Sequence, residues 1–128
     1  MANQKILVVE DEPIVGLELR ETLEKLGYTV PPVVDSGDAV LESTLRHSPD
    51  LVLMDIRLKS FIDGIDAAHR LKMMRNIPVI FLTAQAGDEI RFRAERVRPE
   101  SYLVKPVEEE ILHACIQKAL ANSAANRP

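Results

Sequence analysis

Short apolar runs that stop abruptly at a polar side chain recur along the chain. A continuous apolar run of this kind, without helical spacing, is typical of a strand buried on both faces of a parallel sheet. The pattern predicts three such strands, at residues 6–9, 51–54 and 79–82, and a further strand at residues 102–104. The first residues after them are Glu10, Asp55, Thr83 and Lys105.

A further apolar segment, residues 30–34, predicts another strand but contains Pro31 and Pro32. A proline has no backbone N–H to donate to a sheet, so two prolines do not suit a central strand. We therefore expect this strand at an edge of the sheet.

Apolar residues at helical spacing fill the intervals between the strands. In the first interval Val15, Leu19 and Leu23 lie on one face, Pro13 suits the first turn and Gly27 suits the end. Similar patterns predict helices from the 35–38 turn to about 46, from 64 to 75, around 88–98 and from 108 to 120.

Five alternations of strand and helix predict an α/β protein with a doubly wound parallel sheet. With right-handed crossovers the five strands take the order 2-1-3-4-5, the flavodoxin-like order, which leaves the proline-bearing strand at an edge. We expect a single domain over residues 1–121. Residues 122–128 are small and polar, and we expect them to form a frayed C-terminal tail or the start of a linker.

Composition narrows the functional class. The 128 residues are 46% apolar and 28% charged, as expected for one globular domain, and the net charge of −4 gives no reason to expect direct binding to nucleic acid. No apolar run approaches the roughly 20 residues that span a bilayer, so no membrane contact is expected. A single cysteine, Cys115, fits a reducing compartment, and we expect a cytoplasmic protein.

The polar residues at the strand ends form the candidate site, because the carboxyl ends of parallel strands meet at one rim and ligands bind there. Three carboxylates at such a rim repel one another unless a cation joins them, and Mg²⁺ prefers oxygen ligands and phosphoryl groups. A carboxylate beside Mg²⁺, a hydroxyl and an ammonium group suits nucleophilic attack on phosphorus. The residues concerned are Glu10, Asp11, Asp55, Thr83 and Lys105.

Five motifs in order resemble the receiver domain of two-component response regulators, over residues 4 to 121. They are Val8-Val9-Glu10-Asp11-Glu12-Pro13, Leu53-Met54-Asp55, Asp63-Gly64, Phe81-Leu82-Thr83-Ala84 and Tyr102-Leu103-Val104-Lys105-Pro106. The resemblance implies a phosphoacceptor signalling switch that is not an enzyme in its own right, although it assists its own phosphotransfer and slow autodephosphorylation.

By the same resemblance, Asp55 takes a phosphoryl group from the phosphohistidine of a sensor histidine kinase or a phosphotransfer protein. Asp11 and Asp55 would hold Mg²⁺ together with Glu10, which would act through a water molecule, and the backbone carbonyl of Arg57. Thr83 would hydrogen-bond the phosphoryl group and Lys105 would pair with it.

The resemblance also assigns supporting roles. A cis bond between Lys105 and Pro106 would aim the lysine, and the small side chain of Ala84 would leave the phosphoryl site open. Thr83 and Tyr102 would act as a switch pair that alters the surface of the fourth helix, fifth strand and fifth helix. That surface would bind a downstream effector, an attached output domain or a second copy of the chain.

Two features depart from the usual family pattern. The loop Ile56–Asp63 is one residue longer, and Lys59 stands where a proline is common. These differences make the shape of the loop, and the presentation of the Arg57 carbonyl, the least predictable part of the site.

Three other functions fit parts of the pattern. A flavin-binding electron carrier would need a hydroxyl- and glycine-rich loop after the first strand, where this chain has Glu10-Asp11-Glu12-Pro13. A hydrolase that uses an aspartyl phosphate would need a second acid two residues after Asp55, where Arg57 stands. A receiver-shaped scaffold without phosphorylation would not need the intact set of reacting residues.

Overall fold

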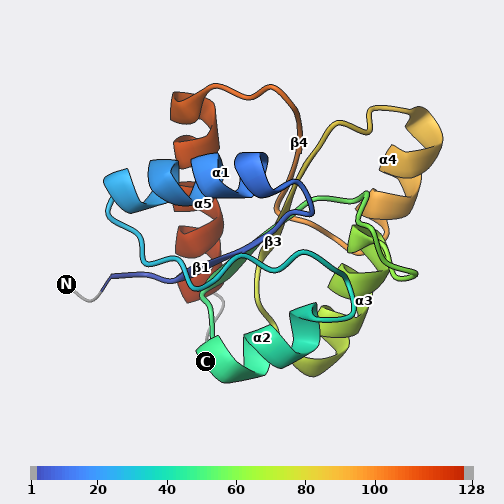
Figure 1. Cartoon of the computed structure of the whole chain (residues 1–128), viewed down its shortest axis with the longest axis horizontal. Coiled ribbons are helices and arrows are strands. Elements are labelled where there is room, and N and C mark those ends of the chain that lie inside the picture. The colour runs from blue at the N-terminus through green and yellow to red at the C-terminus, as the bar shows by residue number, and fades with distance from the viewer. Residues whose placement is uncertain (1–2, 126–128) are drawn as a thin grey trace.

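The computed structural model of the protein describes residues 3–125 and contains a parallel sheet with helices on both faces (Figure 1). The sheet has four strands in the order β1-β2-β3-β4. Their bounds are β1 Ile6–Val9, β2 Leu51–Met54, β3 Val79–Thr83 and β4 Ser101–Val104. These are the four strands that the apolar runs predict, apart from one or two residues at their ends.

The prediction of a fifth strand at residues 30–34 is wrong, and the five-stranded order 2-1-3-4-5 is therefore not confirmed. The segment pairs with β1 only at two isolated bridges, Lys5 with Thr29 and Val9 with Val34. Backbone hydrogen bonds occur at these two ends, for example from Val34 N to Val8 O at 3.0 Å. Between them lie Pro31 and Pro32, which have no N–H, so a continuous ladder cannot form.

Five helices cover the sheet. They are α1 Pro13–Lys25, α2 Val40–His47, α3 Gly64–Met74, α4 Asp88–Glu95 and α5 Glu109–Ala125. The α1 and α5 helices lie on one face and α2, α3 and α4 on the other (Figure 1). Alternate residues of each strand enter the two apolar cores: in β1, Ile6 and Val8 face α1 and α5, whereas Leu7 and Val9 face the other three helices.

The ends of α4 and α5 differ from the sequence prediction, since α4 ends at Glu95, three residues before the predicted end. The α5 helix continues to Ala125, through residues assigned to a frayed tail, because alanines favour a helix and Leu120 is buried against the core. Residues 126–128 of the expected tail lie outside the described part of the chain. Met74, the last residue of α3, is 41% exposed.

The strand register brings the polar strand ends to one edge of the sheet. Val9 pairs with Met54, so Glu10 and Asp55 follow side by side, and Thr83 pairs with Val104, which precedes Lys105. No helix within residues 3–125 is long and apolar enough to cross a bilayer.

Candidate functional site: an acidic cluster at the carboxyl edge of the sheet

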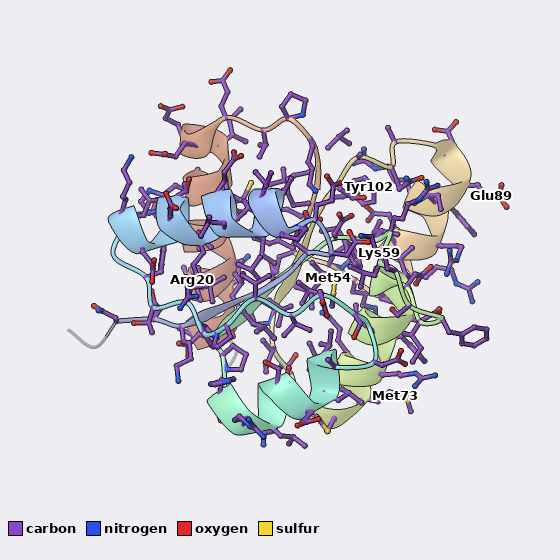
Figure 2. All side chains as sticks on the ribbon, in the orientation of Figure 1. Arg20, Met54, Lys59, Met73, Glu89 and Tyr102 are labelled. Carbon is purple, nitrogen blue, oxygen red and sulfur yellow. The ribbon has the colours of Figure 1, made fainter. Side chains whose placement is uncertain are left out.

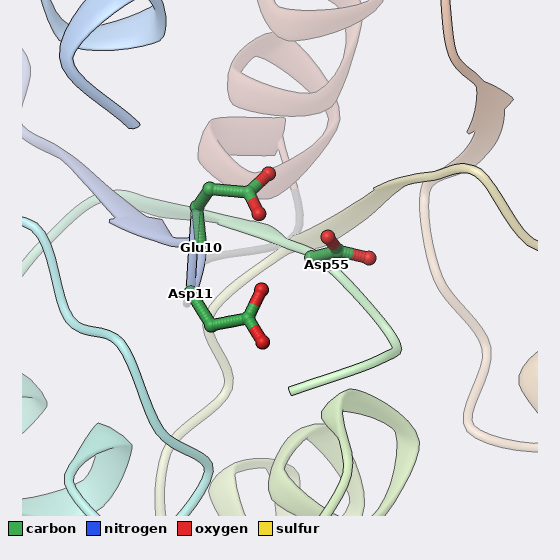
Figure 3. Close-up of side chains that lie close together, drawn as sticks. All are labelled: Glu10, Asp11 and Asp55. Carbon is green, nitrogen blue, oxygen red and sulfur yellow. The ribbon is translucent and has the colours of Figure 1, made fainter. Parts of the chain in front are cut away.

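Three carboxylates converge where β1 and β2 end. One carboxylate oxygen from each of Glu10, Asp11 and Asp55 lies within 4.8 Å of the other two (Figure 3). Glu10 and Asp55 are buried, with Asp55 8% exposed, whereas Asp11 is partly open to solvent. A small pocket of carboxylate oxygens that is open on one side suits a hard divalent cation such as Mg²⁺.

Lys105 reaches into this cluster from the end of β4. Its Nζ donates hydrogen bonds to Glu10 Oε1 at 2.5 Å and to Asp55 Oδ2 at 3.2 Å. The peptide bond between Lys105 and Pro106 is cis, as the resemblance implies. The ammonium group therefore joins two of the three acids and offsets part of their repulsion.

These contacts shift the acid–base behaviour of both partners. Burial raises the pKa of Glu10 and the nearby charge of Asp55 raises it further, although the hydrogen bond from Lys105 works in the opposite direction. Burial lowers the pKa of Lys105, but the hydrogen bond to Glu10 and the charges of Asp55 and Glu10 outweigh burial, so its pKa is raised. Lys105 is thus held firmly in its cationic form.

Backbone N–H groups orient two of the carboxylates. Arg57 N donates to Asp55 Oδ1 and Glu12 N donates to Glu10 Oε2, each at 3.3 Å. The side chain of Arg57 points into solvent. The assignment of the Arg57 carbonyl as a metal ligand stays a prediction.

Thr83 and Tyr102 each form a hydrogen bond with the loop that follows β3. The buried Thr83 hydroxyl accepts a hydrogen bond from Gln85 N at 3.2 Å, and the Tyr102 hydroxyl donates to Gln85 O at 2.5 Å. The ring of Tyr102, which is labelled in Figure 2, packs edge-on against the ring of Phe81, with 6.2 Å between the two centroids. Ala84, between Thr83 and Gln85, is exposed.

The peptide of Gln85 therefore links the two residues of the expected switch pair. No part in the switch was predicted for Gln85, because a contact made through backbone atoms leaves no side-chain signature.

The long loop after β2 closes on itself. Gly64 N donates to Ile56 O at 2.7 Å, and a Cβ at Gly64 would lie only 2.0 Å from Asp55 O. Ser60 Oγ accepts from Gly37 N at 2.9 Å and donates to Ile62 O at 2.6 Å, which fixes the far side of the loop. Within the same loop, Phe61 is fully exposed.

Comparison with known proteins decides the family. The family model for the response regulator receiver domain matches residues 6–117. The chain belongs to this family. Receiver domains are regulatory phosphoacceptor domains of two-component signalling. The family therefore favours this function over the flavin carrier and the hydrolase considered above.

Named relatives agree with the family. The transcriptional regulatory protein PdtaR of Mycobacterium tuberculosis is 33% identical over 118 residues, which are 92% of this chain and 57% of that protein. The phyllosphere-induced regulator PhyR of Methylorubrum extorquens is 34% identical over 91% of this chain and 43% of its own length. The chain thus spans about half the length of the curated relatives that it matches.

Solved structures extend the similarity to the fold. The signal receiver domain of a modulated diguanylate cyclase from Desulfovibrio desulfuricans G20 has a TM-score of 0.92 and 36% identity, over 98% of this chain and all of that one. The receiver domain of sensor histidine kinase PA1611 from Pseudomonas aeruginosa has a TM-score of 0.84 and 32% identity, over 94% and 99% of the two chains. That structure has a magnesium ion coordinated in its active-site cleft.

Proposed function

We propose that Asp55 is the phosphoacceptor of a signalling switch and receives its phosphoryl group from the phosphohistidine of a sensor histidine kinase or phosphotransfer protein. The observation that carries the proposal is the arrangement around Asp55: it shares a pocket with Glu10 and Asp11 and bonds directly to the ammonium group of Lys105. A buried carboxylate between two further acids and a cation has little structural purpose of its own, because burying charge costs free energy.

Asp11 and Asp55 would hold Mg²⁺, with Glu10 acting through a water molecule and Arg57 through its backbone carbonyl. The oxygen-only donor set of the pocket fits this ion. When bound, Mg²⁺ supplies positive charge that offsets the negative charge of the acids and of the transferred phosphoryl group.

The protein side chains perform the remaining tasks. An Asp55 carboxylate oxygen forms a bond to phosphorus while the bond between phosphorus and the histidine nitrogen of the donor breaks, and the donor leaves as an imidazole. Lys105 exchanges its contact with the acids for one with a phosphoryl oxygen. Thr83 gives up Gln85 N as the partner of its Oγ1 and donates its hydroxyl hydrogen to another phosphoryl oxygen.

Movement of Thr83 would release the loop at Gln85, to which Tyr102 is also bonded. The altered surface would be formed by α4, β4 and α5, and it would bind a downstream effector, an attached output domain or a second copy of the chain. We place the protein in the cytoplasm and expect slow autodephosphorylation at the same site.

The test is direct labelling of the chain. Incubation with acetyl phosphate and Mg²⁺ should add one acid-stable but base- and hydroxylamine-labile phosphoryl group, measured by intact mass. Asp55→Asn should abolish the label, because the amide cannot act as the nucleophile. Asp50 lies at the opposite end of β2, so Asp50→Asn is the control and should be labelled like the parent. A labelled Asp55→Asn protein would contradict the assignment.

A further inference from the structure

The α4 helix is held in place by less apolar contact than its neighbours. Ala94 is its only fully buried residue among those described, and Ile90 and Val97 at its inner side are partly buried. Its N-cap residue is Gly87, which offers no side-chain hydrogen bond to the first turn. The position of α4 therefore depends strongly on the polar contacts that it makes.

One of these contacts joins α4 to the start of the adjacent helix α3, and a second joins α3 to the turn that follows α4 (Figure 1). Arg93 Nη2 lies 3.2 Å from Asp63 Oδ2 and 3.8 Å from Asp66 Oδ1, at the start of α3. At the other end, Lys72 Nζ donates to the backbone carbonyl of Arg98 at 2.9 Å. The Arg91–Glu95 pair lies within α4, but the Arg91 guanidinium also lies over the ring of Tyr102, 5.0 Å from its centroid, which is a contact between α4 and β4.

Asp63 is well suited to transmit a displacement. Its Oδ1 accepts from Asp66 N at 2.9 Å and caps α3, while its Oδ2 receives Arg93, so the carboxylate is fixed on both sides. Asp63 also precedes Gly64, which lies directly against the backbone carbonyl of Asp55. Only one tight backbone contact and one ion pair separate the phosphoacceptor from α4.

We propose that Arg93 is a positioning residue that couples the phosphoacceptor loop, residues 55–64, to helix α4 through Asp63. A displacement of this loop at Asp55 would then displace α4 directly, through a contact separate from the one that α4 makes with Tyr102. This inference rests on the proposed function, because it assigns a path by which phosphorylation of Asp55 reaches α4.

The test is hydrogen exchange of the full chain, with and without acetyl phosphate and Mg²⁺, for the parent, Arg93→Gln and Asp63→Asn. Asparagine keeps a side-chain oxygen for the cap of α3 but loses the charge that holds Arg93. Arg96→Gln is the matched control, since this exposed arginine on the same helix makes no ion pair within residues 3–125. Intact mass measures phosphorylation of every sample independently.

In the unphosphorylated state, Arg93→Gln should raise amide exchange in residues 88–95 about two- to fivefold, as expected for loss of a partly exposed ion pair. Asp63→Asn should do the same, and the double variant should add nothing further. On phosphorylation, amide exchange of residues 56–63 should change in every protein. The change in amide exchange of α4 should be smaller by at least about half in Arg93→Gln and in Asp63→Asn than in the parent. Arg93→Lys should restore most of the α4 response to phosphorylation, and the α4 response of Arg96→Gln should match that of the parent.

Additive effects of Arg93→Gln and Asp63→Asn on resting α4 exchange would overturn the proposal, even if no phosphoryl group were transferred. An undiminished α4 response in phosphorylated Arg93→Gln would also overturn it and would leave Asp55 as the phosphoacceptor. Failure of the parent to become labelled would instead count against the proposed function.

Discussion

The rim around Asp55 and the helix α4 lie close together but are built in opposite ways. At the rim, Glu10 and Thr83 are buried and charged groups are paired at short distances. In α4, one alanine is fully buried, Ile90 is partly buried, and the polar links to other elements are the partly exposed Arg93–Asp63 pair and the contact of Arg91 with the Tyr102 ring. A strongly constrained reaction site thus adjoins a weakly constrained helix, which is the arrangement expected when a small local change must alter a larger surface.

Truncation of an apolar residue should show the largest difference between the two regions. Phe81, fully buried in β3, touches the core beneath the site, whereas Ile90 is the partly buried anchor of α4. We expect Phe81→Ala to lower the free energy of unfolding by about 3–5 kcal/mol and Ile90→Ala by about 1–2 kcal/mol. Urea denaturation measures both, and equal losses would show that α4 is packed as firmly as the sheet.

A pair of glycines offers a second comparison. A Cβ at Gly64 would meet Asp55 O at 2.0 Å, whereas a Cβ at Gly87, before α4, would meet no atom within 4 Å. Gly64→Ala should therefore cost about 1–3 kcal/mol and slow the labelling of Asp55 by acetyl phosphate, because the carbonyl next to the nucleophile must move.

Gly87→Ala should change the free energy of unfolding by less than about 0.5 kcal/mol, since a weaker N-cap is offset by a less flexible unfolded chain. Normal labelling of a folded Gly64→Ala protein would show that the tight contact does not position Asp55.

The smallest predicted effect concerns pH. Burial raises the pKa of Glu10 in the folded protein above its ordinary value of 4.5, so above pH 4.5 the folded state binds more protons than the unfolded state. Stability should therefore fall as pH rises from 4.5 through the folded pKa of Glu10. Lys105→Met removes the hydrogen bond that lowers this pKa, so the fall should become steeper and extend to higher pH.

Urea denaturation at a series of pH values from 4.5 to 8 measures this dependence, with Lys118→Met as the control, because Lys118 is exposed on α5. Mg²⁺ should reduce the loss in Lys105→Met, since it would replace the missing positive charge. A pH profile identical to that of the parent would show that Lys105 does not control Glu10.

The sequence was most informative where one physical constraint dominated. Continuous apolar runs located β1, β2 and β3, and a shorter run located β4; the polar residues after these strands identified the acidic cluster and Lys105. The prolines at 31 and 32 were read correctly as unfit for a central strand, but their full effect was underestimated. Two adjacent residues without N–H prevent even an edge strand from forming.

Contacts made through backbone atoms, or across the ends of two helices, were not predictable in this way. The link from Thr83 to Tyr102 passes through the peptide of Gln85, and the pairing of Arg93 with Asp63 depends on the angle between α3 and α4. In the sequence, Arg93 is one of several arginines in a charged helix. Only the fold distinguishes it from Arg91 and Arg96.

The interrupted segment beside β1 also has a consequence for how the protein behaves in a crowded solution. An open sheet edge normally offers a row of donors and acceptors to any passing chain, and this is a common starting point for aggregation. Here the outer flank carries the Pro31-Pro32 pair, so an incoming strand would find no continuous row of donors. The β1 side of the sheet is thereby protected from pairing with strands of other chains.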